Sequence, residues 1–97
     1  MPPKSVKTKQ SDSVKKLYQP PIEIKAEHKE FIKTVGEKLQ KIRTSKNMSP
    51  SQLSTESGIS RTLIYKIEGG DAYFTISTLL QVLDGLEIKA SDFFKLL

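Results

Sequence analysis

The chain has 97 residues, a net charge of +5 and no cysteine. This length is enough for one small domain, and the lack of cysteine excludes disulfides, a thiolate nucleophile and cysteine-based metal sites. No apolar run approaches the ~18 residues of a membrane-spanning helix, and the lysine-rich N-terminus lacks the apolar core of a secretory signal. We therefore expect a cytoplasmic protein with no membrane partner.

The first 25 residues differ in composition from the rest of the chain. Residues 1–25 contain six lysines and two acidic residues, whereas residues 26–97 contain ten basic and nine acidic residues. Because residues 1–16 carry almost no apolar side chains, we expect 1–25 to form a basic, largely disordered tail. Within it, Tyr18, Ile22 and Ile24 could face one way in an extended segment, since Pro20 and Pro21 exclude a helix. A short edge strand, a docking arm and a plain linker all remain open.

A helical pattern begins at about Ala26. Apolar residues recur at spacings of three and four, with charged residues on the other face: Ile32, Val35, Leu39 and Ile42, with Phe31 beside them. This pattern predicts a first helix to about Lys46, followed by Asn47 as a left-handed stop.

Two short helices joined by a tight turn are predicted for residues 49–70. Ser49 is a typical N-cap with Pro50 at the first helical position, Leu53 points inward, and Gly58 permits the left-handed turn that ends the helix. Ser60 is the next N-cap, and its helix should run to about Glu68, before Gly69 and Gly70. This layout is typical of a helix-turn-helix, in which the second helix enters the major groove of DNA.

Two further helices complete the predicted domain. Thr75 should cap a fourth helix with an apolar stripe of Ile76, Leu79, Leu80, Leu83 and Leu86. A final helix over roughly 90–97 carries Phe93, Phe94, Leu96 and Leu97. Five helices with short connections predict an all-α domain over 26–97.

The third helix has two different sides. On a helical wheel, Leu63, Ile64 and Ile67 fall on one side, and the opposite arc carries polar side chains suited to base edges and phosphates: Arg61, Thr62, Tyr65 and Lys66. Arginine pairs with guanine, a hydroxyl with either base edge, and lysine with guanine or phosphate. Backbone N–H groups at the starts of the second and third helices suit phosphate oxygens. The alternative is the ordinary polar outer face of a surface helix.

Glu68 needs a cationic partner. Its negative charge lies at a helix C-terminus, where it opposes the helix dipole, directly after the inward-facing Ile67. Arg43, near the end of the first helix, is the only arginine outside the third helix. We therefore predict a largely buried Arg43–Glu68 pair.

The register of these residues resembles the lambda-repressor-like, Xre-type helix-turn-helix domain over about residues 30–95. The resemblance rests on Val35-Gly36, Leu39, Ile42, Arg43, Ser49, Leu53-Ser54, Gly58-Ile59-Ser60, Ile64, Ile67, Glu68 and Gly70. It implies a five-helix bundle, the Arg43–Glu68 pair and base contacts from Arg61, Thr62 and Lys66, with Tyr65 at their edge. It also implies phosphate contacts from Ser49 and the backbone near Gly69, and we expect a further one from Ser60 at the start of the third helix. Where the family usually has a glutamine that binds phosphate and steadies the recognition helix, this chain has Pro50, so we expect Ser51 or Gln52 to substitute.

These features predict a sequence-specific DNA-binding transcriptional regulator, most simply a repressor. Residues 68–88 are also similar to HipB-type antitoxins, so the alternative is an antitoxin that binds DNA and neutralises a protein toxin. A scaffold that uses the same fold only for protein contacts is a third possibility. An enzyme is not expected, because His28 is the sole histidine and no carboxylate set has acid–base or metal-binding spacing. We expect His28 on the surface, and we expect no cofactor and no metal.

A homodimer is expected, because one recognition helix contacts too few base pairs for useful specificity. The last helix is too short to bury all its apolar residues, and surplus apolar surface often marks an interface. We expect the dimer contact at Phe93, Phe94 and Leu97, with the end of the fourth helix. The alternative is pairing of residues 18–24 as strands across the two-fold axis.

Overall fold

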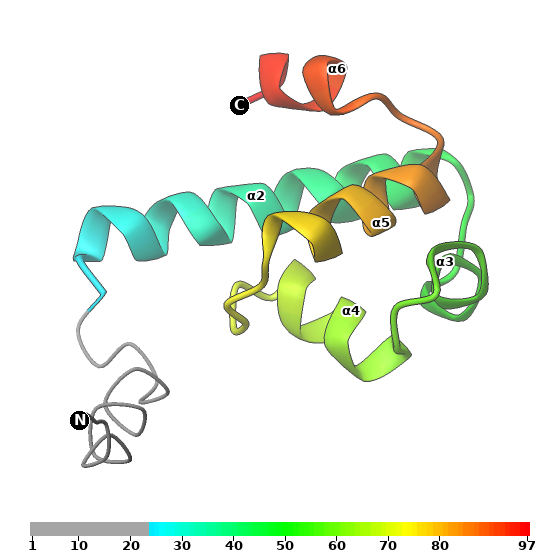
Figure 1. Ribbon diagram of the computed structural model, residues 1–97, viewed down its shortest axis with the longest axis horizontal. Helices are drawn as coiled ribbons and strands as arrows, with labels where there is room; N and C mark the ends of the chain where they lie inside the picture. The colour runs from blue at the N-terminus through cyan, green and yellow to red at the C-terminus, as the bar shows by residue number, and fades with distance from the viewer. Residues whose placement is uncertain (1–23) are drawn as a thin grey trace, which may run out of the picture.

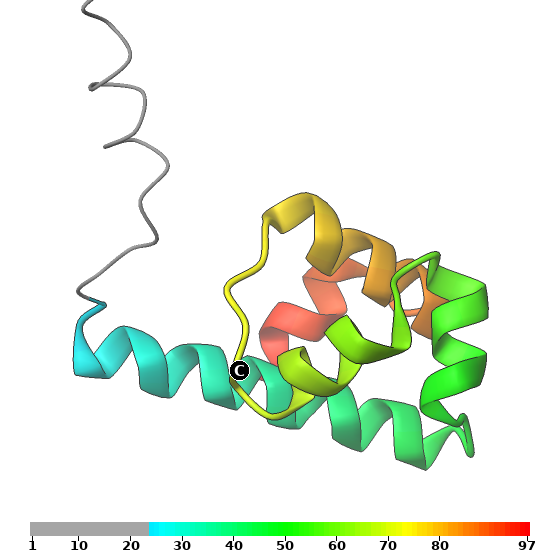
Figure 2. The same cartoon turned by 90° about the horizontal axis from the view of Figure 1, so that it is seen from below.

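The computed structural model describes residues 24–97, which form five helices and no strands (Figures 1 and 2). These are α2 (Ala26–Ser45), α3 (Pro50–Ser57), α4 (Arg61–Glu68), α5 (Ile76–Leu86) and α6 (Ala90–Lys95). The predicted all-α class is therefore confirmed, and α2 begins at the residue where the helical pattern starts. The predicted tail lies almost entirely outside the described residues, as does the predicted arm apart from Ile24. Among the described helices, none has the length and apolar character needed to cross a membrane.

The helix boundaries follow from local cap and turn chemistry. The hydroxyl oxygens of Ser49, Ser60 and Thr75 accept hydrogen bonds from the backbone N–H groups of Gln52, Leu63 and Thr78, at 3.0, 3.2 and 3.1 Å. Each bond satisfies one of the N–H groups that a helix start leaves without an intrahelical partner. The left-handed turns predicted at Asn47 and Gly58 have φ angles of 56° and 77°. The cap predictions are therefore confirmed.

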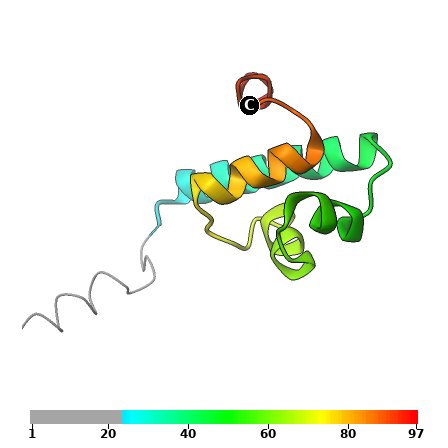
Figure 3. The ribbon, with the colours of Figure 1, turned by 45° about the vertical axis from the view of Figure 1, so that its right-hand side comes forward.

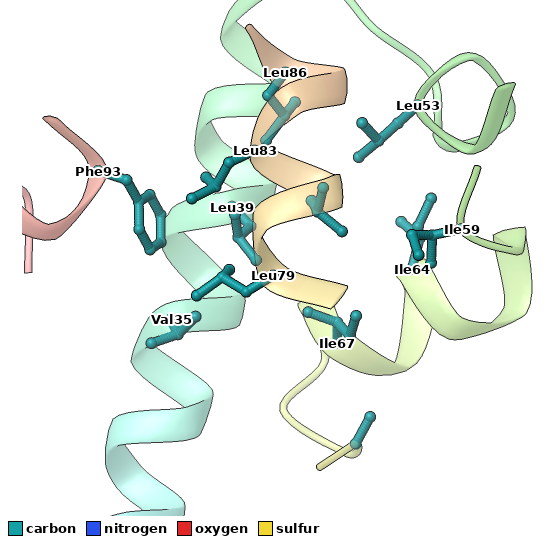
Figure 4. Packing of buried hydrophobic residues seen from close by; sticks show 12 residues of the cluster. Val35, Leu39, Leu53, Ile59, Ile64, Ile67, Leu79, Leu83, Leu86 and Phe93 are labelled. Atoms are coloured by element: carbon teal, nitrogen blue, oxygen red, sulfur yellow. The ribbon is translucent and has the colours of Figure 1, made fainter. Parts of the chain in front are cut away.

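The core lies where α2, α4, α5 and α6 converge, with α3 closing one end (Figure 4). α5 packs beside α3, and α4 packs against both α2 and α3. Figure 3 shows α6 on one side of α2 and α5, with α3 and α4 on the other. The fully buried large side chains come from all five helices: Leu39, Leu53, Ile64, Ile67, Leu83, Leu86 and Phe93.

The structure corrects the predicted apolar stripe of α5. The buried face consists of Leu79, Val82, Leu83 and Leu86, whereas Ile76 and Leu80 are 66% and 42% exposed. Leu80 lies beyond the edge of this face, and Ile76 lies in the first turn, which is less covered by the bundle. The exposed apolar side chains of α5 therefore lie in its first half.

The prediction that Phe93 contacts a second subunit is also wrong. Its side chain is fully buried, and Figure 4 shows the ring pointing into the core. The ring of the neighbouring Phe94 makes an edge contact with it at a centroid distance of 5.6 Å, yet Phe94 itself is 46% exposed. α6 therefore anchors itself to the domain through one aromatic ring and leaves the next one at the surface.

Two glycines allow helices to approach closely. A Cβ atom on Gly36 of α2 would overlap the backbone carbonyl oxygen of Ile67 in α4. A Cβ atom on Gly85 of α5 would lie 2.9 Å from the Cβ of Ser57 in α3. Backbone atoms of a packed helix cannot rotate away as a side-chain end can, so Gly36 sets how closely α4 lies against α2.

We predict that Gly36→Ala lowers the free energy of unfolding by about 1–3 kcal/mol, because α4 must shift outward to make room for the added methyl group. Urea denaturation followed by circular dichroism measures this loss. The control is Glu37→Ala, a change to the same residue type at the neighbouring exposed position, which should change stability by no more than about 0.5 kcal/mol. Equal stability of the two variants would contradict the close-approach argument.

Candidate nucleic-acid interface

Helix α4 has one side packed on the core and the opposite side exposed to solvent. Ile64 and Ile67 are buried and Leu63 is half-buried, so the core fixes the rotation of the helix about its axis. As a result, the four side chains predicted to contact bases are all exposed together on the outer side: Arg61, Thr62, Tyr65 and Lys66. These side chains supply a guanidinium, a hydroxyl, a phenol and an ammonium group, which are hydrogen-bond donors for base edges and phosphates.

Arg61 is linked to α3 by a side-chain hydrogen bond. Its Nη1 donates to the hydroxyl oxygen of Ser51 at 2.9 Å, and Ser51 lies next to Pro50 in the first turn of α3. The sequence predicts that either Ser51 or Gln52 steadies the recognition helix in place of the usual glutamine. In the structure, Ser51 contacts this helix, through Arg61. Gln52 is exposed, and its backbone N–H is used by the Ser49 cap.

The starts of α3 and α4 leave donors available for an anion. Within the described residues, no hydrogen bond uses the backbone N–H of Ser51, Arg61 or Thr62. The exposed cap residues Ser49 and Ser60 accept through their oxygens, which leaves each hydroxyl hydrogen free to donate. Unpaired N–H groups at a helix N-terminus favour phosphate oxygens.

Gly69 does not fit its predicted role as a phosphate contact. It is exposed, but its N–H donates to the carbonyl oxygen of Tyr65 at 3.0 Å. The next two amides, of Gly70 and Asp71, are also paired with carbonyl oxygens of α4. The prediction is corrected because this turn closes on the end of its own helix and has no free amide for a phosphate.

A buried ion pair joins α4 to α2. The Nε of Arg43 donates to Oε2 of Glu68 at 2.7 Å, and its Nη2 donates to Oε1 at 3.1 Å. Both residues are only 7% exposed. The predicted pair is present, and its two parallel bonds fix direction as well as distance.

The same arginine also holds the segment that precedes α3. Its Nη1 donates to the carbonyl oxygen of Met48 at 2.7 Å. One guanidinium group therefore connects the end of α2, the entry to α3 and the end of α4. The Arg43–Glu68 pair could be predicted from the sequence, but no residue pattern indicates the Met48 contact, because every residue carries a backbone carbonyl oxygen.

The remaining candidate residues give no second site. His28 is exposed in the first turns of α2, as expected. Among residues 24–97, no group of three or more histidine, cysteine or acidic side chains could hold a metal ion. The candidate site among the described residues is therefore the surface formed by α4 and the start of α3.

Comparison with known proteins assigns this geometry to a family. The sequence profile of the Cro/C1-type helix-turn-helix DNA-binding domain matches residues 38–96. A search of curated proteins found no match.

Among solved structures, the wild-type restriction-modification controller protein C.Esp1396I is similar with 32% sequence identity and a TM-score of 0.65. The match covers 67% of this chain and 84% of that one. The C.Esp1396I tetramer in complex with its natural 35 base-pair operator is similar with the same identity and TM-score, over 67% of this chain and 86% of that one.

The fold and the exposed face of α4 define a helix-turn-helix protein. This chain belongs to the Cro/C1-type helix-turn-helix DNA-binding family. It is a DNA-binding transcriptional regulator, and the resemblance to the lambda-repressor-like, Xre-type domain is confirmed.

We predict that Arg43→Met lowers the free energy of unfolding by about 3–5 kcal/mol, because it leaves the buried Glu68 carboxylate uncompensated. Arg43→Met combined with Glu68→Leu should be less destabilising than Arg43→Met alone, because no buried charge remains. Urea titrations of the parent, Arg43→Met, Glu68→Leu and the double variant measure both effects. A double variant as unstable as the sum of the two single ones would show that the residues act independently.

Proposed function

We propose that this protein is a repressor that binds a two-fold symmetric operator as a homodimer, with α4 of each subunit in the major groove. The observation that supports this proposal is the exposed face of α4. Burial of Ile64 and Ile67 fixes the rotation of this helix, and the Arg43–Glu68 pair fixes its end. A helix held in this way meets DNA with its side chains already aligned, so less conformational entropy is lost on binding.

Sequence discrimination is assigned to Arg61, Thr62 and Lys66, with Tyr65 at the edge of the contact. A guanidinium group can donate two hydrogen bonds to O6 and N7 of one guanine. The Ser51 hydroxyl, 2.9 Å from Arg61, restricts the arginine before DNA arrives. Ser51 is thus proposed to position Arg61, which compensates in part for Pro50 at the start of α3.

Phosphate binding is assigned to the two helix starts. Ser49 and Gln52 at α3 and Ser60 at α4 would contact phosphates through their side chains, and Ser51 through its unpaired backbone amide. Such contacts fix the orientation of the domain and carry no sequence information themselves.

The lysine-rich residues 1–25 are proposed to add nonspecific affinity as a separate tail, with residues 26–97 as the DNA-binding domain. We place the protein in the cytoplasm, together with its DNA. The antitoxin alternative remains a prediction without an observation in its favour.

Dimer formation is proposed through the apolar surface around α6. Phe94 and Leu97 are 46% and 39% exposed, and Leu80 and Leu96 extend the apolar surface of α5 and α6. A symmetric dimer would cover such surface and place two recognition helices on successive half-sites. The similar C.Esp1396I binds its operator as a tetramer, which supports an oligomeric mode of binding for this chain.

Selection of bound DNA from a random pool tests the function, since a symmetric motif with half-sites about one helical turn apart is expected. On that motif, Arg61→Ala should weaken binding by roughly 1–3 kcal/mol and relax preference at one base pair.

Ser51→Ala should weaken binding in the parent but not in the Arg61→Ala background, because Ser51 acts through the arginine. The control is Lys95→Ala, which removes a cation from α6.

Fluorescence anisotropy on the selected site and on random DNA measures these losses. Equal losses on both DNAs would make Arg61 a phosphate contact. Additive losses from Ser51→Ala and Arg61→Ala would make Ser51 an independent contact. Enrichment of no motif at all would contradict sequence-specific binding.

The dimer is tested with Phe94→Glu, which should shift the mass found by light scattering at tens of micromolar from dimer to monomer. A charge placed in an apolar interface is desolvated without a partner. The control is Asp92→Lys, two residues earlier and thus on the opposite side of α6, which should stay dimeric. A parent chain that remains monomeric on its selected site would contradict the dimer.

A further inference from the structure

A half-open apolar groove of about 260 Å³ lies beside the core. It is lined by Ile24 and the first half of α2, by the segment before α5, by the beginning of α5 and by α6. The lining residues are Ile24, Phe31, Ile32, Val35, Tyr73, Phe74, Ile76, Leu79 and Phe94. Two of them, Val35 and Leu79, are buried core residues (Figure 4), so they form the inner part of the groove.

The outer part of the groove is left uncovered. In Figures 1 and 2 the first turns of α2 extend past the beginning of α5, so no helix covers them on that side. Phe31, Tyr73 and Ile76 are therefore more than half exposed although they surround an apolar recess. Such a combination is typical of a surface that another segment covers.

The described chain begins inside this groove. Ile24 is half-buried and contributes to the lining, so the residues that directly precede it start at the groove. A chain rises at most ~3.6 Å per residue, which keeps Ile22 within about 7 Å of Ile24. A tethered segment binds at a high effective concentration and does not pay the entropy of association.

The preceding sequence has matching chemistry. Residues 17–22, Leu-Tyr-Gln-Pro-Pro-Ile, contain three apolar or aromatic side chains, two prolines and one glutamine, and no charge. The two prolines favour an extended polyproline conformation, and such segments typically bind grooves lined by aromatic rings. Four of the chain's seven aromatic side chains line this groove: Phe31, Tyr73, Phe74 and Phe94.

We propose that residues 17–22 bind in this groove of their own chain and cover it. The bound segment buries the exposed parts of Phe31, Tyr73 and Ile76. It also fixes the point from which the lysine-rich residues 1–16 leave the domain, beside the start of α2. This inference concerns the free protein and does not depend on the proposed operator binding.

The experiment compares methyl NMR spectra of the full chain without DNA. Tyr18→Ser combined with Ile22→Ser should shift the methyl signals of Ile32, Ile76 and Leu79, because a ring and an aliphatic side chain leave the groove. The matched control is Gln19→Ser combined with Glu23→Ser, which alters two polar positions of the same segment and should leave these signals in place. Methyl signals of Leu53 and Ile59, buried away from the groove lining, report that both variants keep the fold.

Nuclear Overhauser effects identify the occupant directly. In the parent chain, ring protons of Tyr18 should show effects to the methyl groups of Ile76 or Leu79. In a sample mixed from differently labelled chains, these effects should stay within one chain. Effects found only between chains would assign the groove to a second copy and overturn the proposal. Groove methyl signals that stay in place when Tyr18 and Ile22 are replaced would also overturn the proposal. So would methyl signals that change only when refolding removes a bound apolar compound, because that compound would then be the occupant.

Discussion

The position of the recognition helix depends on one buried ion pair, between Arg43 of α2 and Glu68 of α4. Burial of two charges contributes little net stability, because desolvation offsets their attraction. The pair instead fixes geometry, since its two bonds at 2.7 and 3.1 Å hold the end of α4 in one orientation. Gly36 lets the helix backbones approach closely enough for this pair to form, and the bond from Arg43 to Met48 extends the constraint to the entry of α3.

Helices α3 and α4 have eight residues each, too few for a stable isolated helix in water. Their side-chain caps and their packing on α2 and α5 therefore hold them in place. The two sides of α4 therefore have separate roles. Ile64 and Ile67, which face inward, hold the helix on the core, and the residues that face outward are free to contact DNA. A change on the inner side would consequently alter DNA binding without any contact to a base.

The domain separates two kinds of surface. Polar donors gather at α4 and the start of α3, whereas exposed apolar side chains gather around α6, the start of α5 and the first half of α2. Figures 1 and 3 show α4 and α6 on opposite sides of α2 and α5. Protein contacts on the apolar side, whether from a second subunit or from the chain's own N-terminal segment, can therefore form without covering the face of α4.

The sequence by itself determined the features that rest on short-range chemistry: the caps at Ser49, Ser60 and Thr75, the turn at Gly58, and the inner and outer sides of α4. Cap and turn residues act on backbone atoms a few positions away, so their effect is visible in the sequence. Only the tertiary structure decided that Phe93 enters the core while its neighbour stays exposed, since a short helix with apolar residues all around has no preferred face. It also decided that Ser51 meets Arg61 and that the amide of Gly69 is already paired. Those outcomes depend on where each helix ends and on which helix lies beside it, and both are set by the packing of the helices.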